Sequence, residues 1–125
     1  MENGKVSQGA DLKDRTKAFV LRIIRLCTAL PKQGAARVIG EQVLRSGTSV
    51  GANYREAIQA RSKAEFVAKL GDSLKEIEET QYWLELLIEG GIVPAHKLYG
   101  LHTEACELTA MFVASLKTAK TNRDR

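Results

Sequence analysis

The chain has 125 residues, of which 44% are hydrophobic and 27% charged, a balance typical of a single globular domain. Its formal net charge of +4 permits binding to an acidic partner but does not establish it. No apolar run approaches the roughly 20 residues of a membrane span, and the N-terminal residues lack the apolar segment of a secretory signal. Cys27 and Cys106 show neither metal-ligand nor redox-motif spacing, so we expect free thiols in a cytoplasmic protein.

Apolar residues recur every three or four positions from Asp11 to Leu30, which predicts a first amphipathic helix. Its apolar stripe comprises Leu12, Thr16, Phe19, Ile23, Leu26, Cys27 and Leu30. The segment PKQG at 31–34 interrupts this helix, and a second helix is expected from Ala35 to Ala60.

The pair Ser62 and Glu65 has the spacing of a capping box, which predicts the start of a third helix. One face of this helix carries Phe66, Leu70, Ile77, Leu84 and Ile88. The segment GGIVP at 90–94 ends it, with Gly90 expected as the left-handed cap. A fourth helix follows Pro94, with a stripe of Leu98, Leu101, Ala105, Leu108, Phe112 and Leu116.

Four amphipathic helices joined by short turns predict an all-α fold, an antiparallel up-down-up-down four-helix bundle. The bundle is expected over residues 11–117. A flexible N-terminus at 1–10 and a flexible C-terminal tail at 118–125 are expected to flank it.

The stretch RSGTSVGANYREA at 45–57 is unusual for a helix interior, where each glycine costs about 1 kcal/mol relative to alanine. A helical wheel turns Ser46, Ser49 and Asn53 into the bundle, which predicts buried polar groups hydrogen-bonded across it. The full predicted polar core is Arg45, Ser46, Ser49, Asn53 and Glu56.

A second side of the same helix carries Gly47, Gly51 and Tyr54, where small residues would permit a close helix contact. We expect this contact to involve another subunit; packing within one chain is the alternative. Off-stripe aromatic residues on the third helix support a second surface. The predicted oligomer interface is Gly47, Gly51, Tyr54, Tyr82 and Trp83.

Two motifs resemble one known family. The first places Arg-Ser, Val, Asn and Glu at Arg45, Ser46, Val50, Asn53 and Glu56. The second comprises Glu76, Glu79, Thr80, Tyr82, Trp83 and Leu84. In this combination the chain resembles, from about residue 18 to 116, the 23S rRNA-intervening sequence protein family.

This resemblance implies an antiparallel four-helix bundle that assembles as a ring, expected to be a homopentamer. Distant relatives implied by it include accessory proteins of diversity-generating retroelements, basic rings that bind a reverse transcriptase and nucleic acid. Most members of the family have no assigned activity, so the resemblance implies the fold more firmly than the function.

Candidate catalytic groups are few. The pairs Glu76/Glu79 and Glu104/Glu107 have the spacing of the magnesium ligands of helical nucleotide-hydrolysing enzymes, but a helical wheel directs them away from the apolar stripes. His96 and His102 lack the Glu-x-x-His pattern of di-iron bundles. We expect no metal, no cofactor and no enzymatic activity.

Charge is distributed unevenly along the chain. Residues 1–61 carry 11 basic and 5 acidic side chains, whereas residues 62–125 carry 8 and 10. The predicted nucleic-acid-binding residues, all on or just after the first helix, are Arg15, Arg22, Arg25 and Lys32. Pairing of this helix with the acidic third helix, or a merely solvated face, are the alternatives.

The sequence therefore predicts a non-enzymatic, homo-oligomeric scaffold or adaptor that binds RNA or DNA through the first helix. A first alternative is a protein-binding module for a neighbouring gene product such as a reverse transcriptase. A second is a metal-dependent, nucleotide-handling enzyme.

Overall fold

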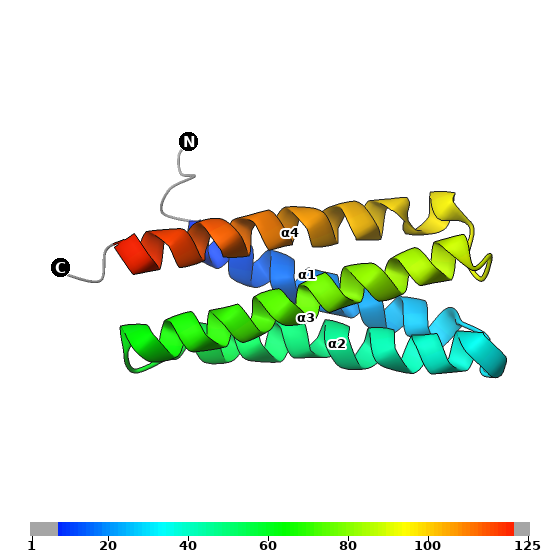
Figure 1. Cartoon of the computed structure of the whole chain (residues 1–125), viewed down its shortest axis with the longest axis horizontal. Coiled ribbons are helices and arrows are strands. Elements are labelled where there is room, and N and C mark those ends of the chain that lie inside the picture. The colour runs from blue at the N-terminus through cyan, green and yellow to red at the C-terminus, as the bar shows by residue number, and fades with distance from the viewer. Residues whose placement is uncertain (1–7, 122–125) are drawn as a thin grey trace.

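A computed structural model describes residues 8–121, with side chains from residue 11 onward. Its four helices are α1 (Gln8–Ala29), α2 (Gly34–Ile58), α3 (Lys63–Glu89) and α4 (Ala95–Thr121). Each helix runs antiparallel to the one before it (Figure 1). Each packs against two neighbours, most extensively α2 against α3 and least extensively α1 against α4. The predicted up-down-up-down four-helix bundle is confirmed.

The core follows an alternating three- and four-residue spacing, the repeat of left-handed helix packing. In α3 the buried positions are Leu70, Ser73, Ile77, Thr80, Leu84 and Leu87, and in α4 they are Leu98, Leu101, Ala105, Leu108 and Phe112. The predicted stripes are confirmed apart from Leu26, Cys27, Phe66, Ile88 and Leu116, which are only partly buried. Because the other faces are polar, no helix within residues 8–121 is apolar enough over a sufficient length to cross a membrane.

Both ends of α3 differ in detail from the expected caps. The Ser62 hydroxyl accepts the Glu65 N–H at 3.0 Å as predicted, but the Glu65 carboxylate accepts the N–H of Arg61 at 3.1 Å instead of that of Ser62. Gly90 is not left-handed, because its N–H continues the helical pattern by donating to the Leu86 carbonyl at 2.9 Å. The left-handed residue is Gly91, with φ of 73°, a conformation that glycine adopts without steric cost.

The helical bundle extends beyond its expected bounds of 11–117. α1 begins at Gln8 and α4 continues to Thr121, so residues 8–10 and 118–121 are helical. Lysines at 117 and 120 are good helix formers, which favours continuation of α4 past its last core contact. The remaining segments expected to be flexible, 1–7 and 122–125, lie outside the described residues.

The inward face of α2 differs from the prediction. Its buried positions are Ala36, Gly40, Val43, Ser46, Gly47, Val50, Tyr54 and Ala57, so Gly47 and Tyr54 belong to the core, whereas Gly51 is partly exposed. A Cβ on Gly47 would lie 2.8 Å from Cγ2 of Ile23, and a Cβ on Gly51 would lie 2.8 Å from Cγ2 of Val20. Tyr54 stacks on Phe112 of α4, with ring centroids 5.6 Å apart. Gly47 and Tyr54 are thus buried by contacts within the chain, which corrects their expected place in a subunit interface. The place of the partly exposed Gly51 in an interface stays a prediction.

The predicted polar core is also corrected. Of its five members only Ser46 is buried; Ser49 and Asn53 are partly exposed, and Arg45 and Glu56 are exposed. Asn53 makes no side-chain hydrogen bond to any residue from 8 to 121. These residues lie on the flank of α2 that borders α3, where charged side chains pair at the surface, as Glu56 does with Lys69 at 2.8 Å.

Candidate interaction surface

The two sequence motifs meet where α2 packs against α3. Arg45 of α2 donates to Glu76 of α3 at 3.3 Å and also to Glu79, one turn further along. Its Nε donates to the side-chain carbonyl of Gln42 at 3.0 Å, which fixes the plane of the guanidinium. The indole N–H of Trp83 donates to Glu79 at 2.9 Å. One continuous network therefore joins residues that are 31 or more positions apart in the sequence.

A buried polar layer lies beneath this network. The hydroxyls of Thr80 and Ser46 lie 2.8 Å apart. Within α3, the Thr80 hydroxyl also lies 2.8 Å from the Glu76 carbonyl. Within α2, the Ser46 hydroxyl donates to the Gln42 carbonyl at 2.8 Å. The Ser73 hydroxyl donates to the Val50 carbonyl of α2 at 2.7 Å. Because an unsatisfied buried hydroxyl is costly, these bonds favour one register of α2 against α3.

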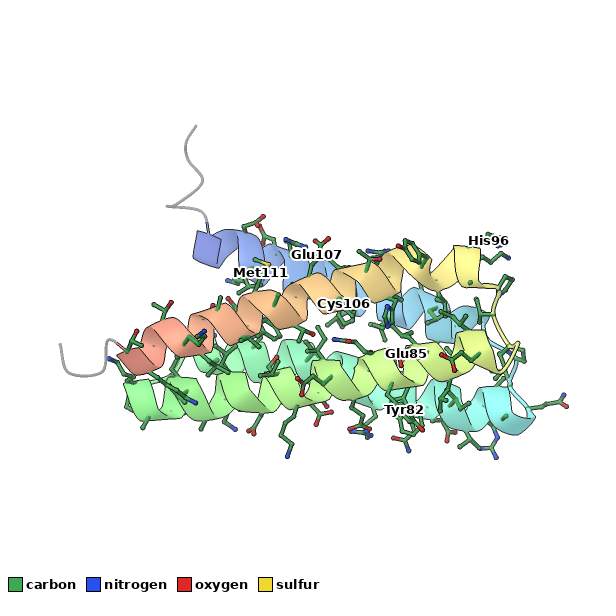
Figure 2. All side chains as sticks on the ribbon, turned by 45° about the horizontal axis from the view of Figure 1, so that its top comes forward. Tyr82, Glu85, His96, Cys106, Glu107 and Met111 are labelled. Carbon is green, nitrogen blue, oxygen red and sulfur yellow. The ribbon has the colours of Figure 1, made fainter. Side chains whose placement is uncertain are left out.

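Aromatic residues border the network. Tyr82 is 55% exposed, and its ring tilts against that of Trp83 with centroids 5.3 Å apart. Figure 2 shows Tyr82 projecting from the side of α3 that faces away from α4. We call Arg45, Glu76, Glu79, Tyr82 and Trp83 together the α2–α3 surface. It presents an aromatic and charged patch at the surface.

The predicted basic face of α1 is divided by internal pairing. The guanidinium of Arg15 donates two hydrogen bonds to the carboxylate of Glu104 of α4, at 3.0 and 2.6 Å, and one to Glu107 at 2.9 Å. Hydrogen bonding to Glu104 is the main cause of a raised pKa of Arg15. Glu107 lies on α4 near Met111, whose sulfur accepts from the same guanidinium at 3.4 Å (Figure 2). Arg15 therefore joins α1 to α4.

The other three predicted nucleic-acid-binding residues behave differently from one another. Lys32 turns back on α1 and donates to the carbonyls of Cys27, Thr28 and Leu30 at 3.3, 2.9 and 3.0 Å, a cationic cap at the helix C-terminus. Arg22 is partly buried and approaches Gly100 of α4. Arg25 is exposed. Neither Arg22 nor Arg25 forms an ion pair with another residue of the described chain.

The two glutamate pairs with metal-ligand spacing are each occupied by an arginine. Glu76 and Glu79 bind Arg45, and Glu104 and Glu107 bind Arg15. Within residues 11–121 no group of three or more His, Cys, Asp or Glu side chains is arranged to hold a metal ion. The geometry favours a structural role for these carboxylates.

A further cluster between α3 and α4 was not predicted. His102 Nε2 lies 3.0 Å from Glu85, and its Nδ1 lies 3.8 Å from the sulfur of Cys106. Glu85 and Cys106 occupy the facing sides of α3 and α4, whereas His96 lies at the start of α4 (Figure 2). Desolvation, together with the charge of Glu85, raises the pKa of Cys106, which opposes nucleophile activation. The Cys106 sulfur also lies 3.6 Å from Oε1 of Gln81. The four-residue spacings Gln81/Glu85 and His102/Cys106 were the available sequence signal.

The fold and these surfaces define a class of protein: a four-helix bundle whose polar groups form networks between helices at its surface. Within that class, residues 10–114 match the model of the 23S rRNA-intervening sequence protein, and the chain belongs to this family, as the motifs indicated.

One solved structure is similar over almost its entire length. It is a protein of unknown function from the S23 ribosomal protein family of Bacteroides thetaiotaomicron, 38% identical, with a TM-score of 0.82. The match covers 87% of this chain and 97% of that chain. The comparison with curated proteins found no match.

Proposed function

We propose that this protein is a non-enzymatic, homo-oligomeric scaffold of the cytoplasm whose α2–α3 surface binds a neighbouring subunit. The observation that carries this proposal is Tyr82, an aromatic side chain that is 55% exposed beside an ordered ionic network. Tyr, Trp and Arg are the residue types enriched at energetically important positions of protein interfaces, and this surface combines all three.

The order of the α2–α3 surface strengthens the argument. Arg45 binds two carboxylates and neutralises one of their two charges, so the formal net charge of the patch is −1. Trp83 is held through its indole N–H, which lowers the entropy lost when a partner packs against it. The pentameric ring is the assembly that the family resemblance implies, and it is part of this proposal.

Sedimentation or light scattering of the purified protein tests the assembly. Tyr82→Lys should convert the oligomer to monomers without unfolding, because Tyr82 is more than half exposed in the single chain. The matched control is Tyr99→Lys, since Tyr99 is 72% exposed on α4. A monomeric parent protein, or a Tyr82→Lys variant that stays assembled, would refute the proposal; a monomeric parent would instead favour a module for a different protein.

A second candidate function is nucleic-acid binding, favoured by the two arginines of α1 that have no ion-pair partner within residues 11–121. Repetition of Arg22 and Arg25 around a ring would multiply the phosphate contacts of one subunit. In fluorescence anisotropy with labelled RNA and DNA, Arg22→Ser combined with Arg25→Ser should reduce the salt dependence of binding. Unchanged salt dependence, or no binding at low salt, would exclude this face.

A further inference from the structure

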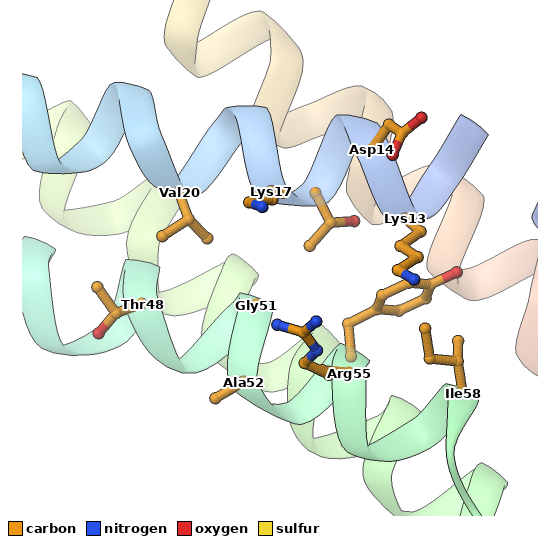
Figure 3. A pocket seen from close by; sticks show the side chains of 11 residues that line it. Lys13, Asp14, Lys17, Val20, Thr48, Gly51, Ala52, Arg55 and Ile58 are labelled. Carbon is orange, nitrogen blue, oxygen red and sulfur yellow. The ribbon is translucent and has the colours of Figure 1, made fainter. Parts of the chain in front are cut away.

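A groove of about 590 Å³ lies between the N-terminal half of α1 and the C-terminal half of α2. Figure 3 shows its walls: Lys13, Lys17 and Val20 come from α1, and Arg55 and Ile58 come from α2. The volume is within the usual range of small-molecule sites, about 300–1,000 Å³. It does not overlap the α2–α3 surface, and none of the predicted nucleic-acid-binding residues lines it.

The charge of the groove is positive, with three cationic side chains and one carboxylate in its lining. Lys13, Lys17 and Arg55 all line it, and none of the three pairs with an acidic side chain within residues 11–121. The one acidic residue in the lining, Asp14, points away from α2 (Figure 3). Arg15 and Arg45, by contrast, are each bound to two carboxylates, and neither of them lines this groove.

A buried, unsatisfied donor lies in the same lining. Tyr54 is only 5% exposed, lines the groove, and makes no hydrogen bond to any residue that the structure describes. Burial raises the pKa of Tyr54, so the phenol stays protonated and can donate. A phenol that lines a groove and has no partner among the described residues is available to donate to a bound ligand.

The rest of the lining is apolar. Val20, Ala52 and Ile58 contribute aliphatic surface next to the three cations. Gly51 faces Val20, so the wall here is backbone where another residue would place a side chain. The groove thus pairs an apolar wall with a cationic rim and one neutral donor.

We propose that this groove binds a phosphate ester with an apolar body, its phosphate held by Lys13, Lys17 and Arg55. The phenol of Tyr54 donates a hydrogen bond to the same ligand, and Val20 and Ile58 cover its apolar part. Two sources share this chemistry: a free nucleotide-sized metabolite and the phosphate of a nucleic-acid strand. This site goes beyond the proposed scaffold function and does not depend on it.

Calorimetric titration of the full-length protein with AMP, inorganic phosphate and a 5′-phosphorylated single-stranded oligonucleotide tests the site. Lys17→Ala combined with Arg55→Ala should weaken binding at least tenfold. Lys75→Ala, which removes an exposed cation from α3, is the matched control and should change affinity less than twofold. Binding of AMP assigns the site to a metabolite, and binding of the oligonucleotide alone assigns it to nucleic acid; both support the proposal.

Tyr54→Phe is the sharpest variant, because it removes only a hydroxyl that has no partner within the described chain. It should leave the thermal midpoint unchanged or raised while weakening ligand binding about threefold to tenfold. Absence of binding by all three probes, or affinity that is insensitive to the Lys17/Arg55 and Tyr54 changes, would overturn the proposal. Binding of a polyglutamate peptide but of none of the phosphate probes would also overturn it, in favour of a protein ligand.

Discussion

Gly47 of α2 lies directly against Ile23 of α1, so closely that a Cβ on Gly47 would lie 2.8 Å from Cγ2 and 3.0 Å from Cγ1 of Ile23. Ile23 is fully buried and β-branched, so it has little freedom to move aside. Gly40 and Gly51 make similar approaches to Leu30 and Val20. The glycines of α2 therefore permit close packing of α1, which offsets their cost in helix propensity.

Gly47→Ala should destabilise the protein, because overpacking costs about 1–3 kcal/mol and exceeds the gain in helix propensity of about 1 kcal/mol. In an Ile23→Ala background the same change should cease to be destabilising, since the methyl groups it meets are gone. Gly71→Ala is the matched control: nothing lies within 4 Å of its Cβ position, and we expect stabilisation of about 0.5–1 kcal/mol. Urea unfolding of the four variants measures these effects, and equal effects of Gly47→Ala in both backgrounds would contradict the packing explanation.

Thr80→Val should lower the free energy of unfolding by about 1–2 kcal/mol, because it removes the hydroxyl that bonds Ser46 in a fully buried position. Thr28→Val provides the comparison, since Thr28 is exposed and bonds only the Ile24 carbonyl of its own helix. Its expected effect is within about 0.5 kcal/mol. Equal losses in the two variants would show that the Thr80–Ser46 bond contributes nothing specific.

Arg15 and Glu104 should show a favourable coupling in a double-mutant cycle of Arg15→Met and Glu104→Gln. Their side chains are 29% and 20% exposed and form two hydrogen bonds, so we expect about 0.5–1 kcal/mol. The exposed i,i+4 pair Arg37–Glu41, at 56% and 66% exposure, serves as the reference and should give about 0.3 kcal/mol. A coupling for Arg15–Glu104 no larger than the reference would mean that this pair does not fasten α1 to α4.

Cys106 should react slowly with iodoacetamide for an exposed cysteine, because desolvation and the Glu85 charge raise its pKa above the ordinary 9.0. In a Cys27→Ser background, the pH of half-maximal alkylation should be higher for the folded protein than for the urea-unfolded chain, and Glu85→Gln should lower it. The folded protein holds this proton to higher pH than the unfolded chain does, so the associated stability is lost as pH rises from the unfolded pKa through the folded pKa. A half-maximal pH for the folded protein at or below that of the unfolded chain would contradict the assignment.

The number, order and approximate bounds of the helices were predictable because they depend on local signals. A three- and four-residue apolar spacing, the Ser62 cap and the PKQG and GGIVP breaks act over single turns of chain. The same periodicity identified the buried residues of α1 and α4. In α3 it identified Leu70, Ile77 and Leu84 but missed Ser73, Thr80 and Leu87, two of which are polar and carry no hydrophobic signal. The two motifs also sufficed to indicate the family.

Tertiary structure alone decided the orientation of α2 and the partners of its charges. Gly, Ser and Ala are small on several faces of α2, so hydrophobicity could not distinguish the face against α1 from the flank beside α3. The steric fit of Gly47 to Ile23 and of Ser46 to Thr80 resolved that choice. Arg15 bonds Glu104, 89 positions away in the sequence. Tyr54 lines a groove that exists only because α1 packs against α2. Such pairings depend on how whole helices rotate and slide against one another, which no local pattern encodes.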